Sequence, residues 1–149
     1  MNKKKYYTTA FMKLIVFLMF SHSTTLVQAQ TIIDLRSDDV KWEYNSAEDK
    51  KNNEPMIISG YFVTHGDQQV EWFQNGTDTR YNFNITSTSG TWSDINEDGE
   101  LLFNAVCDDL HGTIRIYRSS ENLYLHLDFS ESNALSPNFL LSINSYNKL

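Results

Sequence analysis

The sequence predicts an all-β domain, an antiparallel meander that closes into a small up-and-down β-barrel. Apolar residues recur at every second position after residue 30, and no window shows the apolar stripe of an amphipathic helix. Turn residues separate these runs at short intervals. Such short connections cannot hold the crossovers of parallel strands, so neighbours pair antiparallel. Because open sheet edges invite aggregation, the meander closes on itself, and a two-sheet β-sandwich is the alternative.

Length and composition agree with one globular domain. The chain has 149 residues, of which 40% are hydrophobic and 13% aromatic, with only 6 Gly, 2 Pro and 1 Cys. These values exclude collagen-like, low-complexity and disulfide-scaffold proteins, each of which has a compositional bias that is absent here. The aromatic content also excludes a wholly disordered chain, because it supplies enough apolar surface for a core.

Residues 1–29 have the pattern of a cleaved signal peptide. Lys3, Lys4 and Lys5 form a basic start, an apolar run covers 14–20, and Ala29 supplies the small residue before a cleavage point. This run is far shorter than the roughly 20 residues that span a bilayer, so no permanent membrane anchor is expected. The sequence therefore predicts a secreted or periplasmic protein with a single all-β domain at 30–149.

The charge balance favours some partners and disfavours others. The chain has 12 basic and 19 acidic residues, a net charge of −7. Residues 1–29 contain four lysines and no acidic residue, so cleavage leaves 8 basic against 19 acidic residues and a net charge of −11. Such a chain repels phosphate backbones, which argues against nucleic-acid binding. The same negative charge would attract a basic protein partner, so the second functional hypothesis is an acidic protein-binding module such as an inhibitor or immunity-type protein.

The expected strands follow the alternating runs. Clear alternation covers 40–44, 80–86, 101–105, 113–117, 123–129 and 139–144. The more continuously apolar stretch 56–64 is expected to be covered on both faces, 91–94 is counted as a further short strand, and hydrophilic 45–54 is expected to be a loop. Turns are expected at His65-Gly66-Asp67, Asn75-Gly76, Ser89-Gly90, Asp98-Gly99 and Ser119-Ser120.

One hairpin can be predicted in register. Its apolar residues are even-numbered in the first strand, at Ile114 and Ile116, and odd-numbered in the second, at Leu123 and Leu125. Opposed residues share a face, so the loop must be even: either Ser119-Ser120 or 119–122. The second choice places Arg115 opposite His126 and Thr113 opposite Asp128. Both choices make an outward polar row of Tyr124, His126 and Asp128.

The predicted architecture resembles that of lipocalins and avidins. Gly90-Thr91-Trp92 is similar to the Gly-x-Trp motif of lipocalins. That motif opens the first strand in lipocalins, whereas here it lies in the middle of the chain. The resemblance is therefore architectural, and no site residues are transferred from it.

Aromatic residues suggest a binding function. Barrel ligands occupy the mouth and contact aromatic linings, so a small apolar ligand or a glycan is the first functional hypothesis. The tyrosines and Glu71-Trp72-Phe73 could line a pocket or stack against a sugar, or the large aromatics could simply fill the core. The candidate ligand-binding residues are Trp42, Trp72, Tyr81, Phe83 and Phe103.

One segment resembles half of a calcium loop. Residues 94–99 fit the pattern D-x-[DN]-x-[DN]-G, which makes Asp94, Asn96 and Asp98 candidate metal ligands. The twelfth position, where such loops carry a bidentate Glu, is Ala105. Further oxygens would have to come from a neighbouring loop, such as that of Asp78 or Glu121. A plain acidic turn is the alternative, and no other cofactor is expected.

An enzyme is the third hypothesis. No nucleophile elbow, HExxH pattern or phosphate-binding glycine loop is present. The histidines of 30–149 are His65, His111 and His126, and a strict meander with 91–94 as a strand would place 65–67 and 107–111 on the same rim. Cys107, as the only cysteine, cannot form an intramolecular disulfide, and it is interpreted as a small buried residue at a strand end.

Overall fold

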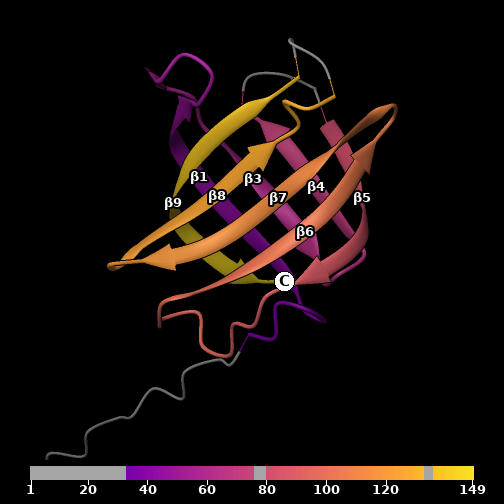
Figure 1. The fold of residues 1–149 in the computed structure, drawn as a ribbon. Coiled ribbons are helices and arrows are strands. Elements are labelled where there is room, and N and C mark those ends of the chain that lie inside the picture. The colour runs from indigo at the N-terminus through magenta and orange to yellow at the C-terminus, as the bar shows by residue number, and fades with distance from the viewer. Residues whose placement is uncertain (1–32, 76–79, 133–135) are drawn as a thin grey trace, which may run out of the picture. The chain divides into compact units, whose positions relative to one another are not determined.

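The fold is all-β, as the sequence predicts. The computed structural model describes residues 33–75, 80–132 and 136–149, and these contain no helix. Figure 1 shows the strands wound around a common axis. The nine strands are β1 (Asp39–Asp49), β2 (Glu54–Met56), β3 (Gly60–His65), β4 (Gln69–Gln74), β5 (Arg80–Ser89), β6 (Gly99–Cys107), β7 (Leu110–Ser119), β8 (Asn122–Asp128) and β9 (Asn138–Lys148).

Eight of these strands form a closed antiparallel barrel. The sheet order is β2-β1-β3-β4-β5-β6-β7-β8-β9, and β1 also pairs with β9, which closes the ring. Strand β2 lies outside the ring and pairs with the last residues of β1. The β1–β2 hairpin projects at the top of the barrel in Figure 1. Closure confirms the up-and-down barrel rather than the sandwich.

The ends of the barrel are defined by the connections between strands. At the lower end, nearest the C-terminus in Figure 1, lie the β3–β4, β5–β6 and β7–β8 connections and the segment 33–38. At the upper end lie the last residues of β1, β4, β6 and β8.

The β7–β8 hairpin has one of the two predicted registers. Thr113 pairs with Asp128, Arg115 with His126, and Ser119 with Asn122. Ser120 and Glu121 form the turn with φ values of 49° and 71°, and two positive φ values match the twist of a tight hairpin. Leu123, Leu125 and Leu127 are buried, whereas the predicted row of Tyr124, His126 and Asp128 faces outward and is only partly covered.

Two expectations about element boundaries are wrong. Strand β1 continues through 45–49, where a loop was expected, because its polar side chains lie on a segment paired with both β2 and β9. Residues 91–94 form no strand and belong to the β5–β6 connection. The stretch 56–64 was expected to be covered on both faces. This is confirmed at the neighbouring residues Val63 and Thr64, which are 7% and 1% exposed.

Aromatic and aliphatic side chains fill the barrel interior. Trp42, Phe62, Phe103 and Phe129 are completely buried, and Phe62 stacks on Trp72 with ring centroids 5.5 Å apart. The buried polar groups of these rings have partners. Trp42 Nε1 donates to Thr64 Oγ1 at 3.0 Å, and Trp72 Nε1 donates to the Tyr44 hydroxyl at 2.8 Å. An unpaired indole N–H would cost free energy, so these bonds allow tryptophan to fill the core.

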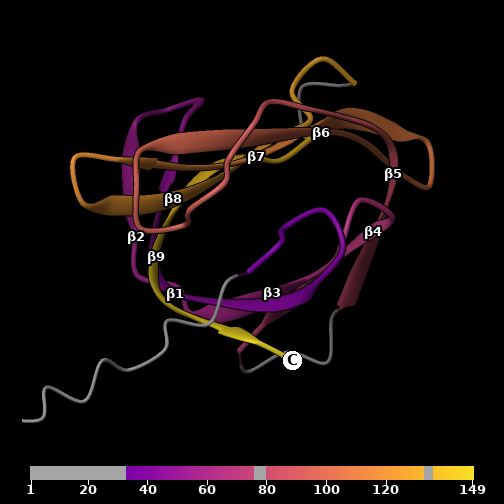
Figure 2. The same cartoon turned by 90° about the horizontal axis from the view of Figure 1, so that it is seen from below.

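The lower end of the barrel is covered. Ile33 and Leu35 from the segment before β1, and Ile95 from the β5–β6 connection, are buried and belong to the same core as the barrel side chains. Seen from below, the segment that precedes β1 lies within the ring of strands (Figure 2). The barrel is therefore a packed core rather than an open tube.

The hydrogen bond between Trp72 and Tyr44 yields a stability prediction. Replacing Tyr44 with Phe removes the acceptor and leaves the buried indole N–H unpaired, which should lower the free energy of unfolding by about 1–3 kcal/mol. Urea denaturation measures this change. Tyr146→Phe is the matched control, because the hydroxyl of Tyr146 makes a longer, exposed bond of 3.3 Å, and its loss should change stability far less.

Candidate functional site

Four of the five predicted ligand-binding aromatics lie in the core. Trp42, Trp72, Phe83 and Phe103 are at most 3% exposed. Tyr81 is 39% exposed at the start of β5, where it stacks on Trp72 with centroids 5.3 Å apart. The four buried residues belong to one hydrophobic core and so fill the interior themselves. Ligand binding by this set stays a prediction.

Among the hollows of the described surface that are open to solvent, we compare three, and the largest of these three has a volume of about 890 Å³. It lies between the β1–β2 hairpin and the outer faces of β7, β8 and β9. We name it the tyrosine groove, after the two tyrosines that line it. Its lining residues are Ser46, Ala47, Glu48, Asn53, Pro55, Tyr117, Ser119, Ser120, Asn122, Tyr124, Leu140 and Ser142.

The two tyrosines form a paired aromatic platform. Tyr117 on β7 lies directly opposite Tyr124 on β8, and their rings stack with centroids 5.2 Å apart. The guanidinium of Arg115 lies 4.4 Å from the Tyr117 ring centroid, and Glu100 holds that guanidinium by an ion pair. Partial burial raises the pKa of the Tyr117 hydroxyl, so the group stays protonated as a hydrogen-bond donor at neutral pH.

Small polar side chains surround this platform. Hydroxyls come from three strands or turns at Ser46, Ser120 and Ser142, and carboxamides come from Asn53 and Asn122. These groups both donate and accept hydrogen bonds. The groove therefore combines flat apolar surface with adaptable polar groups along its edges.

A second outward aromatic pair has no such groove. Tyr61 on β3 stacks on Phe73 of β4 with centroids 4.6 Å apart. Lys41 and Arg80 lie over these rings, 4.6 Å and 5.2 Å from the respective centroids. Neither aromatic residue lines any of the three hollows. This pair has the properties of an ordinary cross-strand pair that stabilises the sheet.

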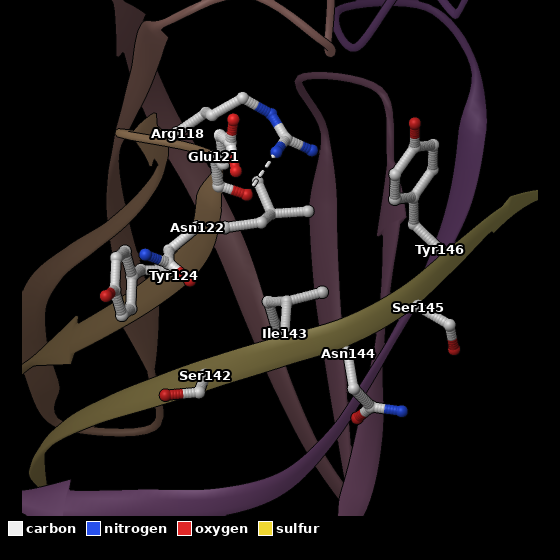
Figure 3. A pocket seen from close by; sticks show the side chains of 10 residues that line it. Arg118, Glu121, Asn122, Tyr124, Ser142, Ile143, Asn144, Ser145 and Tyr146 are labelled. Atoms are coloured by element: carbon white, nitrogen blue, oxygen red, sulfur yellow. Dashed lines mark hydrogen bonds between the residues drawn. The ribbon is translucent and has the colours of Figure 1, made fainter.

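Next to the tyrosine groove, a smaller hollow of about 420 Å³ lies between the start of β8 and the C-terminal part of β9. We call it the seam. Figure 3 shows the side chains of Ile143 and Tyr146 projecting from β9 into this space, with Arg118 at its opposite side. Asn122, Tyr124 and Ser142 line both the seam and the groove.

The candidate calcium ligands belong to the β5–β6 connection. Asp94 Oδ1 accepts hydrogen bonds from the backbone and side-chain nitrogens of Asn96, at 2.9 and 2.8 Å, and these bonds lower the pKa of Asp94. Asp98 Oδ1 accepts from the backbone N–H of Ser120 at 3.2 Å. Among the described residues, no three His, Cys, Asp or Glu side chains gather closely enough to hold a metal ion. Calcium binding stays a prediction.

The expectation that two histidine loops share a rim is wrong. His65 ends β3 at the lower end, whereas 107–111 connect β6 and β7 at the upper end. The error follows from counting 91–94 as a strand, because one extra strand moves every later loop to the opposite rim. His65 Nδ1 lies 3.0 Å from Asp39, and His126 Nε2 lies 2.9 Å from the Asn138 side-chain oxygen.

Sequence reasoning named the tyrosines as possible sugar-stacking residues but did not single out Tyr117 and Tyr124. The signal was available, because the 119–122 loop alternative places these two residues directly opposite each other. The groove wall could not be inferred in this way, since 45–54 was expected to be a loop.

Comparisons of the chain with protein-family models, with curated protein sequences and with solved structures find no match. In the part of the chain that the structure describes, no helix is long and apolar enough to cross a membrane.

Cys107 yields a prediction about reactivity. It is the last residue of β6 and is 8% exposed, and burial raises the pKa of its thiol, as does the nearby charge of Asp108. Because the thiolate is the reactive form, Cys107 should react with Ellman's reagent at pH 8 at least about tenfold more slowly in the folded protein than in urea. Equal rates in the two states would contradict this burial.

Proposed function

We propose that this protein is an exported β-barrel that binds a glycan in the tyrosine groove, on its outer wall. The observation that carries the proposal is the pair of stacked, half-buried rings of Tyr117 and Tyr124 on the floor of a groove of about 890 Å³. A pyranose ring has a face of C–H groups, which packs on an aromatic face while its hydroxyls bind polar neighbours.

The filled interior supports an external site. The core side chains pack against one another, and the barrel's own tryptophans have their N–H groups paired within it. A ligand inside the barrel would have to displace this packing, at a cost of several kcal/mol. The interior therefore gives less support to an enclosed apolar ligand than the groove gives to a glycan.

The charge of the groove favours a neutral glycan. Glu48 is the acidic residue of its lining, and Lys50 lies 2.8 Å from that carboxylate in an ion pair. The remaining polar groups are hydroxyls and carboxamides. With a net charge of −11 after signal cleavage, the protein would repel a strongly anionic saccharide.

The binding test uses a glycan microarray, followed by calorimetry with the best-binding saccharide. Tyr117→Ala removes half of the stacking platform and should weaken binding at least about tenfold, whereas Tyr117→Phe keeps the ring and should retain most of the affinity. Tyr61→Ala is the matched control. It also removes one ring of an outward cross-strand pair, but outside the groove, and should leave binding unchanged.

Failure of the proposal is distinguishable from misfolding. All three variants should keep a β-sheet circular dichroism spectrum and a cooperative unfolding transition. Absence of binding to any neutral glycan on the array, or equal losses for Tyr117→Ala and Tyr61→Ala, would contradict a site in the tyrosine groove.

Export has its own test. Expression of the full chain in a bacterium with a secretion pathway should give an exported product that begins at Gln30, as determined by intact mass and N-terminal sequencing. Replacing Ala29 with Arg removes the small residue that the peptidase requires, and this variant should accumulate uncleaved. A native product that retains residues 1–29 would overturn the proposed signal.

A further inference from the structure

The barrel wall opens where β9 continues beyond its neighbour. Strand β8 begins at Asn122, and its pairing with β9 starts at Leu123 opposite Ile143. Strand β9 continues to Lys148, and residues 145–148 pair along one edge with β1. No other described strand pairs with their opposite edge. Such an edge offers backbone donors and acceptors to an added extended chain.

A register shift in β9 places two of its side chains in the seam. The pairing of β9 with β1 is irregular around Tyr44, and Asn144 has no partner in the register. Ile143 and Tyr146 consequently project to the same side, into the seam (Figure 3). The Tyr146 ring packs with its centroid 5.9 Å from that of buried Trp42. The Ile143 and Tyr146 side chains thus give the seam an apolar part.

Two segments next to the seam carry carboxylates, and one of these, Glu121, lines the seam itself. Asp94, Glu97 and Asp98 come from the β5–β6 connection and Glu121 from the β7–β8 turn, and all four residues are exposed. Asp98 reaches the turn through its bond to Ser120, and the Arg118 guanidinium links the two segments by donating to the carbonyl oxygens of Ile95 at 2.6 Å and Glu121 at 2.7 Å. The two segments that Arg118 links thus carry four exposed carboxylates, and the charge of Lys148 at the end of β9 is paired with Asp38.

The negative charge of these carboxylates favours one of two kinds of strand that could pair with β9. A second copy of the chain would bring the same four carboxylates, and the net charge of −11 carried by its residues 30–149, against the first. Like charges across an interface oppose association. A strand with cationic side chains would instead be attracted and steered to the edge.

We propose that the seam binds an extended basic segment of a partner protein, which adds as a strand to the edge of β9 at 144–148. Its lysine or arginine side chains face Asp94, Glu97, Asp98 and Glu121, while its backbone pairs with β9. The surface adjoins the tyrosine groove, yet Glu97 and Glu121 line no part of that groove and Tyr117 lines no part of the seam. Each site can therefore be tested without the other.

The test uses three blocked ten-residue peptides and the protein without residues 1–29. In one, Lys alternates with Thr; in the second, Glu replaces Lys; in the third, Pro replaces Thr. The Lys/Thr peptide should bind, and it should slow amide hydrogen exchange at 144–148. The Glu/Thr peptide lacks the charge and the Lys/Pro peptide lacks half of the backbone donors, so both should bind at least about tenfold more weakly.

Matched variants test whether the carboxylates near the seam, rather than the net charge of the protein, attract the peptide. Glu97→Lys combined with Glu121→Lys should weaken binding of the Lys/Thr peptide at least about tenfold, and Glu97→Gln with Glu121→Gln should have a smaller effect in the same direction. Asp109→Lys combined with Glu131→Lys makes the same change in net charge at the upper end and should leave binding unchanged, as should Tyr117→Ala. Hydrogen exchange of each variant without peptide checks that the barrel is folded.

Four results would overturn the proposal: no binding of the Lys/Thr peptide at millimolar concentration, equal binding of the Lys/Pro peptide, protection outside 144–148, or equal losses for the lower-end and upper-end variants. A dimer that buries 144–148, detected by sedimentation with hydrogen exchange, would assign the edge to a second copy instead. If Tyr117→Ala loses glycan binding but keeps peptide binding, the result supports the glycan site in the groove and a separate peptide site in the seam.

Discussion

The pairing of β1 with β9 is the constraint on which the rest of the structure depends. It joins strands from the two ends of the domain and converts a meander with two open edges into a ring. Once the ring is closed, every strand has a single inner face, and alternate side chains have to fill the space that it encloses. The packed core, the outward polar rows and both candidate binding surfaces follow from this closure.

Because large aromatic side chains fill the closed barrel, the outer wall is the surface available to a ligand. Trp42 and Trp72 occupy the interior, and their N–H groups are bonded to Thr64 and Tyr44 within it. The pairing of both indole donors removes the cost of burying these N–H groups. The filled interior leaves the outer wall as the place where shape and charge vary, as the contrast between the two outward aromatic pairs illustrates. Tyr61 with Phe73 lies under cationic side chains, whereas Tyr117 with Tyr124 lies in a groove.

Both candidate surfaces exist because strand lengths are unequal. The upper part of β1 extends beyond β3 to pair with β2, and this hairpin forms one wall of the tyrosine groove. At the lower end, β9 extends beyond β8, and the exposed edge forms the seam. A barrel with strands of equal length would have neither feature. The two surfaces meet at Asn122, Tyr124 and Ser142, so an occupant of one lies beside an occupant of the other.

The sequence by itself determined the fold class and the inward residues of most strands, and it limited the β7–β8 hairpin to two registers, because period-two alternation and turn parity are local properties. The structure has the second of these registers. It did not determine where β1 ends or that 91–94 is a connection. Polar residues at 45–49 become a strand only when β2 and β9 pair with them, and Trp92 in 91–94 bonds within its own loop, to the carbonyl oxygen of Glu97. Only the tertiary structure showed at which end of the barrel each histidine lies and where the groove and the seam form. Each of these depends on how far paired strands overlap. That overlap is set by contacts between residues distant in the chain.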